Sequence, residues 1–130
     1  MSNLTIDHVG IGVERLEEGV ELYRLLGLTL GEVEELPEEG VRLVFAGSEI
    51  ELLQPTDAEG PLARFLARRG EGIHHVALRV EDLDRAVREF RARGLEPLGE
   101  PRKGARGARV IFLHPKTTAG SLIELVERGS

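Results

Sequence analysis

The chain of 130 residues has the length of one compact domain, and its 17 basic and 23 acidic residues give a net charge of −6. The two signs of charge are interspersed, which argues against general nucleic-acid binding, because that function requires a basic surface. The absence of cysteine excludes disulfides, thiolate metal sites and cysteine nucleophiles. The sequence contains no signal-like or long apolar segment, so we expect a cytoplasmic protein that does not enter a membrane.

The chain opens with a strand pattern and continues with a helix pattern. Residues 5–13 alternate, with Val9 and Ile11 on one face and His8 on the other. Residues 15–26 place apolar side chains at helical spacing. Three strand candidates follow, near 28–35, 41–46 and 49–54. The first part of the chain therefore predicts one strand, one helix and three further strands.

A connecting helix at about 58–70 leads into a second copy of this pattern. Residues 73–95 lie over residues 6–28 without a gap, and ten of the 23 positions are identical, His75 over His8 among them. Strand candidates follow near 95–98, 108–114 and 121–127. A repeat of half the chain length predicts two copies of one structural unit.

The repeat predicts an α+β protein made of two tandem βαβββ modules. We place the first module at about 4–56 and the second at about 72–128, within a single domain that covers residues 1–130. A unit of about 65 residues is marginal by itself, so we expect the modules to share a core or to pair with another chain.

A second correspondence in the repeat brings two glutamates into equivalent places. Residues 50–53 resemble residues 123–126 at a spacing of 73, so the second copy has six extra residues in a longer hairpin loop. Strand alternation puts His8, His75, Glu51 and Glu124 opposite the aliphatic side chains of their strands.

These four side chains are a donor set for a divalent cation. Imidazole and carboxylate ligands suit zinc, cobalt, nickel, manganese or iron, and four of them leave two octahedral positions open for water or a chelating substrate. The small residues of the same strand faces, Gly10, Gly12 and Ala77, are expected to leave room for a ligand. A single in-strand histidine or glutamate is more often a surface or hydrogen-bonded residue, so the prediction depends on the repeat.

A local basic segment stands out in this acidic chain. Five basic residues and no acid lie between Pro101 and Lys116, and they are Arg102, Lys103, Arg106, Arg109 and Lys116. Such a segment suits the binding of phosphate groups, and the alternative is a solvated loop.

Several long pieces of the sequence resemble a known family. These pieces are IDHVGIGV at 6–13, FLARRGEGIHHVALRV at 65–80, EPRKGARGARVIFLHPK at 100–116 and LIEL at 122–125. They resemble the glyoxalase or vicinal-oxygen-chelate superfamily and, within it, the methylmalonyl-CoA epimerase family over nearly the full length. The resemblance implies an eight-stranded U-shaped sheet around a metal cleft.

The resemblance also implies a ligand set, a cofactor and an assembly. The family's metal ligands fall on four residues, His8, Glu51, His75 and Glu124. The cofactor it implies is a divalent cation, with cobalt, manganese, nickel and zinc all compatible with these ligands. Related proteins are commonly homodimers, so we expect a homodimer.

The implied reaction is the epimerisation of (R)- and (S)-methylmalonyl-CoA through removal of the α-proton and a metal-stabilised enolate. Glu124 is the predicted first acid/base. Part of the family has a glutamate at the position of Leu43, so the candidates for the second acid/base here are Glu51 and a metal-bound water. Arg102 and Lys116 are the predicted contacts of the coenzyme A phosphates, and the acyl-CoA substrate is the expected small-molecule partner.

Three related functions compete with this interpretation. They are a lactoylglutathione lyase (glyoxalase I), a metal-dependent ring-cleaving dioxygenase, and a ligand-binding protein of the same fold. The pieces GEGIHH and FLHPK favour the epimerase over the lyase, and a fourth ligand at Glu51 argues against the dioxygenase. A binding protein needs no metal ligands, so replacing Glu124 distinguishes it from the enzymes.

Overall fold

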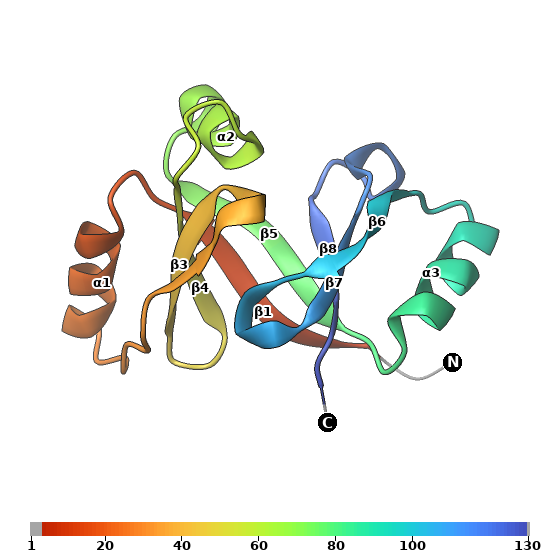
Figure 1. Cartoon of the computed structure of the whole chain (residues 1–130), viewed down its shortest axis with the longest axis horizontal. Coiled ribbons are helices and arrows are strands. Elements are labelled where there is room, and N and C mark those ends of the chain that lie inside the picture. Colours follow the sequence, from red (N-terminus) through yellow and green to blue (C-terminus); the bar gives the residue numbers. More distant parts are fainter. Residues whose placement is uncertain (1–3, 130) are drawn as a thin grey trace. The chain divides into compact units, whose positions relative to one another are not determined.

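The computed structural model describes residues 4–129, which form eight strands and three α-helices in two compact units (Figure 1). The first unit is His8–His74, and the second contains the described residues of Met1–Asp7 and His75–Ser130. Each unit contains one run of strand, helix and three strands. The predicted α+β class with tandem βαβββ modules is therefore confirmed, while the single domain over 1–130 stays a prediction.

The first unit has the strand order β2-β3-β4-β1. Strands β1 and β4 are parallel, whereas β3 is antiparallel to both β2 and β4. The elements are β1 (Thr5–Gly12), α1 (Leu16–Leu25), β2 (Glu34–Leu36), β3 (Val41–Ala46), β4 (Ile50–Pro55) and α2 (Pro61–Arg69), with a 3-10 turn at Pro37–Glu39.

The second unit repeats this arrangement with the order β5-β8-β7-β6. Strands β5 and β8 are parallel, and β7 is antiparallel to both β6 and β8. The elements are β5 (Gly72–Arg79), α3 (Leu83–Ala92), β6 (Pro97–Lys103), β7 (Arg109–Leu113) and β8 (Ile123–Glu127), with 3-10 turns at Ala105–Gly107 and Pro115–Thr117.

One face of each unit's strands packs against that unit's helix. In the first unit Leu16 of α1 lies in a buried cluster with Val44 and Leu52, and in the second unit Leu83 of α3 lies in a cluster with Leu125. Because strand side chains alternate, the residues between these apolar ones point to the opposite face. The helices therefore fix which face of each unit carries the polar candidates.

Helices α1 and α3 share one kind of hydrogen bond at their starts. The backbone N–H of Leu16 donates to Gln54 Oε1 at 2.8 Å, and that of Leu83 donates to Glu127 Oε1 at 2.6 Å. The acceptors are 73 residues apart, which is the spacing of Glu51 and Glu124. Each acceptor satisfies one of the N–H groups that a helix leaves without an intrahelical partner, and so joins the last strand of a module to its helix.

Two predicted strands have different bounds in the structure. The strand expected near 28–35 is β2, which covers only Glu34–Leu36, and Leu30 forms an isolated bridge with Ala46. Pro37 follows β2 directly, and it cannot donate a backbone hydrogen bond to extend the ladder. The strand expected near 95–98 extends further as β6, because the basic segment continues the pairing with β7 to Lys103.

The prediction that Gly12 and Ala77 leave room for a ligand is wrong. A Cβ atom at Gly12 would lie 3.2 Å from the side chain of Leu62 and 3.4 Å from that of Leu66, so α2 fills this space. Ala77 is completely buried in a cluster with Val110 and Val126. Small residues at these positions allow close packing instead.

Candidate functional site

In the first unit His8 and Glu51 form a buried pair on the face that α1 leaves uncovered. His8 Nε2 lies 3.3 Å from Glu51 Oε1, and the two side chains are 4% and 6% exposed. His8 is on β1 and Glu51 on β4, and these strands are paired in parallel with Gly10 opposite Glu51. We call His8 and Glu51 the first pair.

In the second unit His75 and Glu124 form a second pair of the same kind. His75 Nε2 lies 3.5 Å from Glu124 Oε1, with the side chains 3% and 10% exposed. Here Ala77 of β5 is opposite Glu124 of β8. The repeat therefore builds one buried histidine–glutamate pair in each unit, on the strand face that the alternation predicted for these four side chains.

A phenylalanine supports the histidine in each pair. The rings of His8 and Phe45 are edge to face at 5.5 Å between centroids, and those of His75 and Phe112 have the same distance and arrangement. Phe45 is also the direct cross-strand partner of Glu51, as Phe112 is of Glu124. Packing on both members of a pair restricts their rotamers, which preserves the orientation of the ligand atoms.

The donor chemistry of both pairs fits a divalent cation. A histidine nitrogen and a carboxylate oxygen that bind one ion at about 2.1 Å, at right angles, lie about 3 Å apart. The observed separations of 3.3 and 3.5 Å are close to this value. His8, Glu51 and His75 are all buried and each offers one such ligand atom. These residue types indicate a divalent metal without specifying which ion.

The residue before His8 is held by two arginines. The Asp7 carboxylate is completely buried; it accepts from Arg79 Nη2 at 2.8 Å and Nε at 3.0 Å, and from Arg128 through Nε at 2.9 Å and Nη2. All three residues belong to the second unit. The interaction anchors the start of β1 to the ends of β5 and β8.

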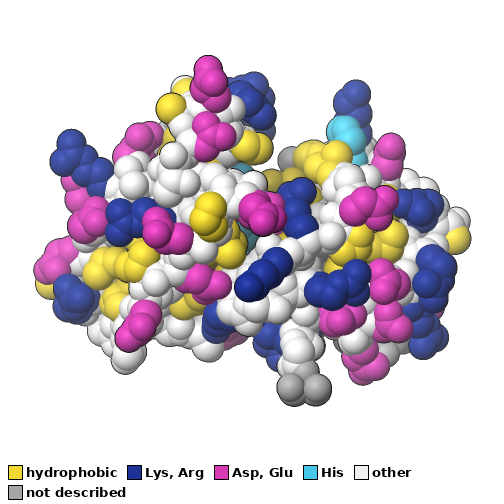
Figure 2. All heavy atoms as spheres, viewed as in Figure 1, with side chains coloured by type: hydrophobic (Ala, Val, Ile, Leu, Met, Phe, Trp, Pro, Cys, Tyr) yellow, Lys and Arg dark blue, Asp and Glu magenta, His cyan; other side chains and the backbone are white. Residues whose placement is uncertain are grey.

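The basic segment divides between the two faces of β6 and β7. Arg102 lies over the ring of Phe112, with its guanidinium carbon 5.7 Å from the centroid. Arg109 instead donates two hydrogen bonds to Asp84 of α3, at 3.3 Å each, and these raise the pKa of Arg109. Figure 2 shows Lys and Arg side chains gathered over this hairpin. Arg102 is therefore on the face of the second pair, and Arg109 is not.

The other predicted anion contact, Lys116, lies in the enlarged loop. Its backbone N–H donates to His114 Nδ1 at 3.1 Å, and the Thr117 hydroxyl donates to the His114 carbonyl at 2.8 Å. The backbone N–H of Glu96 in turn donates to the Thr117 hydroxyl oxygen at 3.2 Å. The six additional residues of the second copy thus form an ordered turn that presents Lys116.

Two features of the site were not predicted from the sequence. Phe45 and Phe112 are 67 residues apart, the same spacing as His8 and His75, so the repeat contained a signal for them. The hydrogen bonds of Gln54 and Glu127 to the helix starts could be found only in the three-dimensional structure.

Among residues 4–129, no helix has both the length and the apolar character needed to cross a membrane.

Comparison with known proteins defines the class. Residues 7–112 match the model of the Glyoxalase/Bleomycin resistance protein/Dioxygenase superfamily. This match covers most of the chain, so the protein belongs to that superfamily.

Relatives place the chain more narrowly. It is 38% identical over 126 residues to mouse mitochondrial methylmalonyl-CoA epimerase, covering 92% of this chain and 71% of the relative. It is 39% identical over 127 residues to the ethylmalonyl-CoA/methylmalonyl-CoA epimerase of Cereibacter sphaeroides, covering 92% and 95%. A Streptomyces coelicolor methylmalonyl-CoA epimerase variant in complex with 2-nitronate-propionyl-CoA superposes with a TM-score of 0.93 at 36% identity, covering 99% and 97%. Within the superfamily, the chain belongs to the methylmalonyl-CoA epimerase family.

Proposed function

We propose that this protein is an isomerase that interconverts (R)- and (S)-methylmalonyl-CoA. The observation that carries the proposal is the pair of buried histidine–glutamate sets that the repeat builds at equivalent positions. The family membership supports the substrate, because the relatives are named for this reaction. It also favours the epimerase over a glyoxalase I, a dioxygenase and a ligand-binding protein.

The proposed metal ligands are His8, Glu51, His75 and Glu124, two from each unit. They would offer two nitrogens and two oxygens to the cation, and the thioester and carboxylate oxygens of the substrate would be its further ligands. Cobalt, manganese, nickel and zinc all suit this donor set. When bound, the cation supplies the positive charge that stabilises the enolate formed as the α-proton leaves.

The protein side chains supply the proton transfers and the binding of coenzyme A. Glu124 is proposed to exchange a proton with the α-carbon on one face, and the second acid/base predicted from the sequence is Glu51. Arg102 and Lys116 are proposed to bind the coenzyme A phosphates. Arg102 is supported in this role by its position on the face of the second pair, against Phe112.

Location and assembly complete the proposal. We propose a cytoplasmic homodimer, as the sequence predicted. The name of the mouse relative places that protein in mitochondria. Fractionation of the source cells and light scattering of the purified protein at several concentrations test these two points.

The proposed reaction is tested by following the α-carbon of methylmalonyl-CoA in heavy water by NMR. Metal-stripped protein is expected to be inactive, and added Co²⁺ is expected to produce deuterium incorporation together with inversion. Methylglyoxal with glutathione serves as the alternative substrate. Turnover of that substrate without exchange on methylmalonyl-CoA would instead identify a glyoxalase I.

A further inference from the structure

Inversion of a carbon centre requires a proton acceptor on one face of the planar enolate and a proton donor on the other, and each can be a side chain or a water. This inference rests on the proposed function. Glu124 is assigned to one face. In the first unit, Glu51 is turned toward His8 at 3.3 Å and is proposed as a metal ligand. Another carboxylate on the same face of the first unit is therefore a further candidate for the second proton transfer.

The pairing of β2 with β3 places Glu34 on that face. Glu34 is the direct antiparallel partner of Leu43, and direct partners project their side chains to the same side of a sheet. Leu43 is two residues from Phe45, so these two side chains also share a face. Phe45 contacts His8 and is the cross-strand partner of Glu51. Glu34 thus shares one strand face with the first pair.

The opposite face of β2 and β3 confirms this orientation. Val44 packs with α1 in the apolar cluster of Leu16 and Leu52, away from Phe45. Glu35 is paired with Arg42 and shares the helix-side face with Val44 by alternation. Glu35 is exposed, whereas Glu34 is half-buried. Within β2, β3 and β4, Glu34 and Glu51 are the two carboxylates on the face of the first pair.

The spacing suits a group that acts next to a bound substrate. Glu34 is one strand beyond Phe45 and one residue pair along, which corresponds to about 4.8 Å across the sheet and about 7 Å along it. A carboxylate at this separation is displaced from the ligand atoms of the first pair but lies on the same strand face as Phe45 and Leu43. Leu43 is 1% exposed and offers no proton acceptor, so Glu34 is the nearest carboxylate to that position in its own strand pair.

We propose that Glu34 is the second catalytic acid/base of the epimerase. In one direction the α-carbon–hydrogen bond breaks, its proton moves to one of Glu34 and Glu124, and the electron pair passes into the thioester carbonyl. The other carboxyl group then delivers its proton to the opposite face, forming a new carbon–hydrogen bond. The reverse direction exchanges the two roles and restores both protonation states.

The test is the Glu34→Gln variant in heavy water, with each pure epimer of methylmalonyl-CoA and Co²⁺. Removing one acid/base group is expected to slow interconversion at least 100-fold. The epimer whose proton is taken by Glu124 is expected to keep exchanging its α-hydrogen for deuterium without inverting. The other epimer is expected to stop exchanging, and Co²⁺ affinity measured by calorimetry is expected to stay within about twofold of the parent.

The chain offers a matched control on the neighbouring residue. Glu35→Gln removes the same charge from the opposite face of β2 and is expected to leave interconversion unchanged. The double variant Glu34→Gln with Leu43→Glu returns a carboxylate to the paired position and is expected to recover at least tenfold of the lost rate. Together these variants separate an acid/base role from a general effect of charge.

Two outcomes would overturn the proposal for Glu34. If the Glu34→Gln variant still inverts both epimers at the parent rate, Glu51 would remain the candidate for the second acid/base. Loss of exchange for both epimers together with loss of Co²⁺ binding would make Glu34 part of the metal site instead. Parent protein that exchanges neither epimer would overturn the proposed function itself, so the two failures are distinguishable.

Discussion

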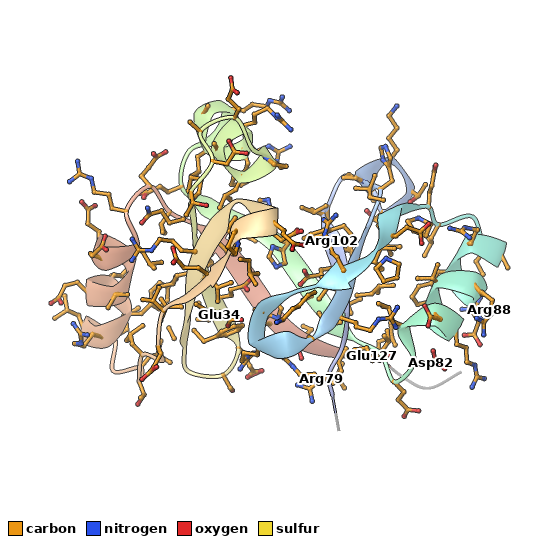
Figure 3. The ribbon with its side chains drawn as sticks, in the orientation of Figure 1. Glu34, Arg79, Asp82, Arg88, Arg102 and Glu127 are labelled. Atoms are coloured by element: carbon orange, nitrogen blue, oxygen red, sulfur yellow. The ribbon has the colours of Figure 1, made fainter. Side chains whose placement is uncertain are left out.

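The two histidine–glutamate pairs are built alike, but the strands beside them differ in charge. Glu34 of β2 is paired with Leu43, and Arg102 of β6 is paired with Val110, which is the equivalent of Leu43 in the repeat. Glu34 and Arg102, both labelled in Figure 3, therefore occupy corresponding positions with opposite charges. The repeat preserves the proposed ligands and changes the neighbouring residues, as expected if a symmetric ligand set binds an asymmetric substrate.

The largest predicted asymmetry lies between the two glutamates that are proposed as ligands. Glu124→Gln is expected to lower the epimerisation rate at least about 1,000-fold, because it removes an acid/base group. Glu51→Gln is expected to cost less than tenfold, since an amide oxygen still binds the cation and Glu34 supplies the proton. Steady-state kinetics with saturating Co²⁺ measure both. Equal losses in the two variants would contradict the division of roles.

The two histidines are expected to contribute equally to metal affinity, whereas the two glutamates are expected to contribute unequally to the reaction rate. His8→Ala and His75→Ala each remove one nitrogen ligand, and each is expected to weaken Co²⁺ binding at least about 100-fold, or about 2.7 kcal/mol. His74→Ala is the control, because His74 is next to His75 on the opposite strand face and contacts Phe65. Calorimetric titration measures all three. A loss in His74→Ala comparable with that in His75→Ala would disprove the assigned strand faces.

The Asp7 interaction has no counterpart in the first unit. The positions that correspond to Asp7, Arg79 and Arg128 in the repeat carry His74, Gly12 and Pro55. Asp7→Asn removes a buried charge that interacts with Arg79 and Arg128, whose side chains are 54% and 21% exposed. We expect the unfolding free energy to fall by about 2 kcal/mol, which is less than the loss for a fully buried ion pair.

Urea unfolding of the metal-free protein measures the effect of Asp7→Asn. Glu21→Gln, which removes an exposed partner of Arg24, is the control and is expected to change stability by less than about 0.5 kcal/mol. If Asp7→Asn lowered the unfolding free energy as little as Glu21→Gln, the two arginines would not be needed to anchor β1.

The two helix starts give the smallest expected difference. Glu127→Ala removes an acceptor that also carries a negative charge at the positive end of α3, and we expect a loss of about 1.5 kcal/mol. Gln54→Ala removes a neutral acceptor at α1, with an expected loss of about 1 kcal/mol. Glu127→Gln is expected to recover most of the larger loss. If Glu127→Gln is as unstable as Glu127→Ala, the hydrogen bond is not the source of the stability.

The sequence predicted the strand face on which the two histidines and two glutamates lie because two periodicities agree. Strand alternation orients His8 and Glu51 without knowledge of the partner strand, and the repeat supplies the second pair at fixed spacings. The long, regular strands and helices were placed correctly for the same reason. The bounds of the short strand β2 were not predicted correctly, because its length depends on the turn from Pro37 to Gly40. Gly40 has a positive φ of 69°, which suits glycine.

Strand alternation and the repeat do not predict contacts between elements that are distant in the sequence. Gly12 was expected to open space for a ligand, and only the position of α2 shows that Leu62 and Leu66 fill it. The role of Gln54 likewise depends on where α1 begins relative to β4. The position of Glu34 beside Leu43 follows from the register of a hairpin, and a shift of one residue would have turned it to the other face.

The central claim is that both pairs bind the same ion, and the number of Co²⁺ ions bound per chain tests it most directly. Calorimetric titration of metal-free protein, with cobalt content checked by elemental analysis, is expected to give one ion per chain. It is expected to give no high-affinity ion after either His8→Ala or His75→Ala. Two ions per chain, or one ion that survives either substitution, would mean that the pairs act as separate sites and would contradict the account.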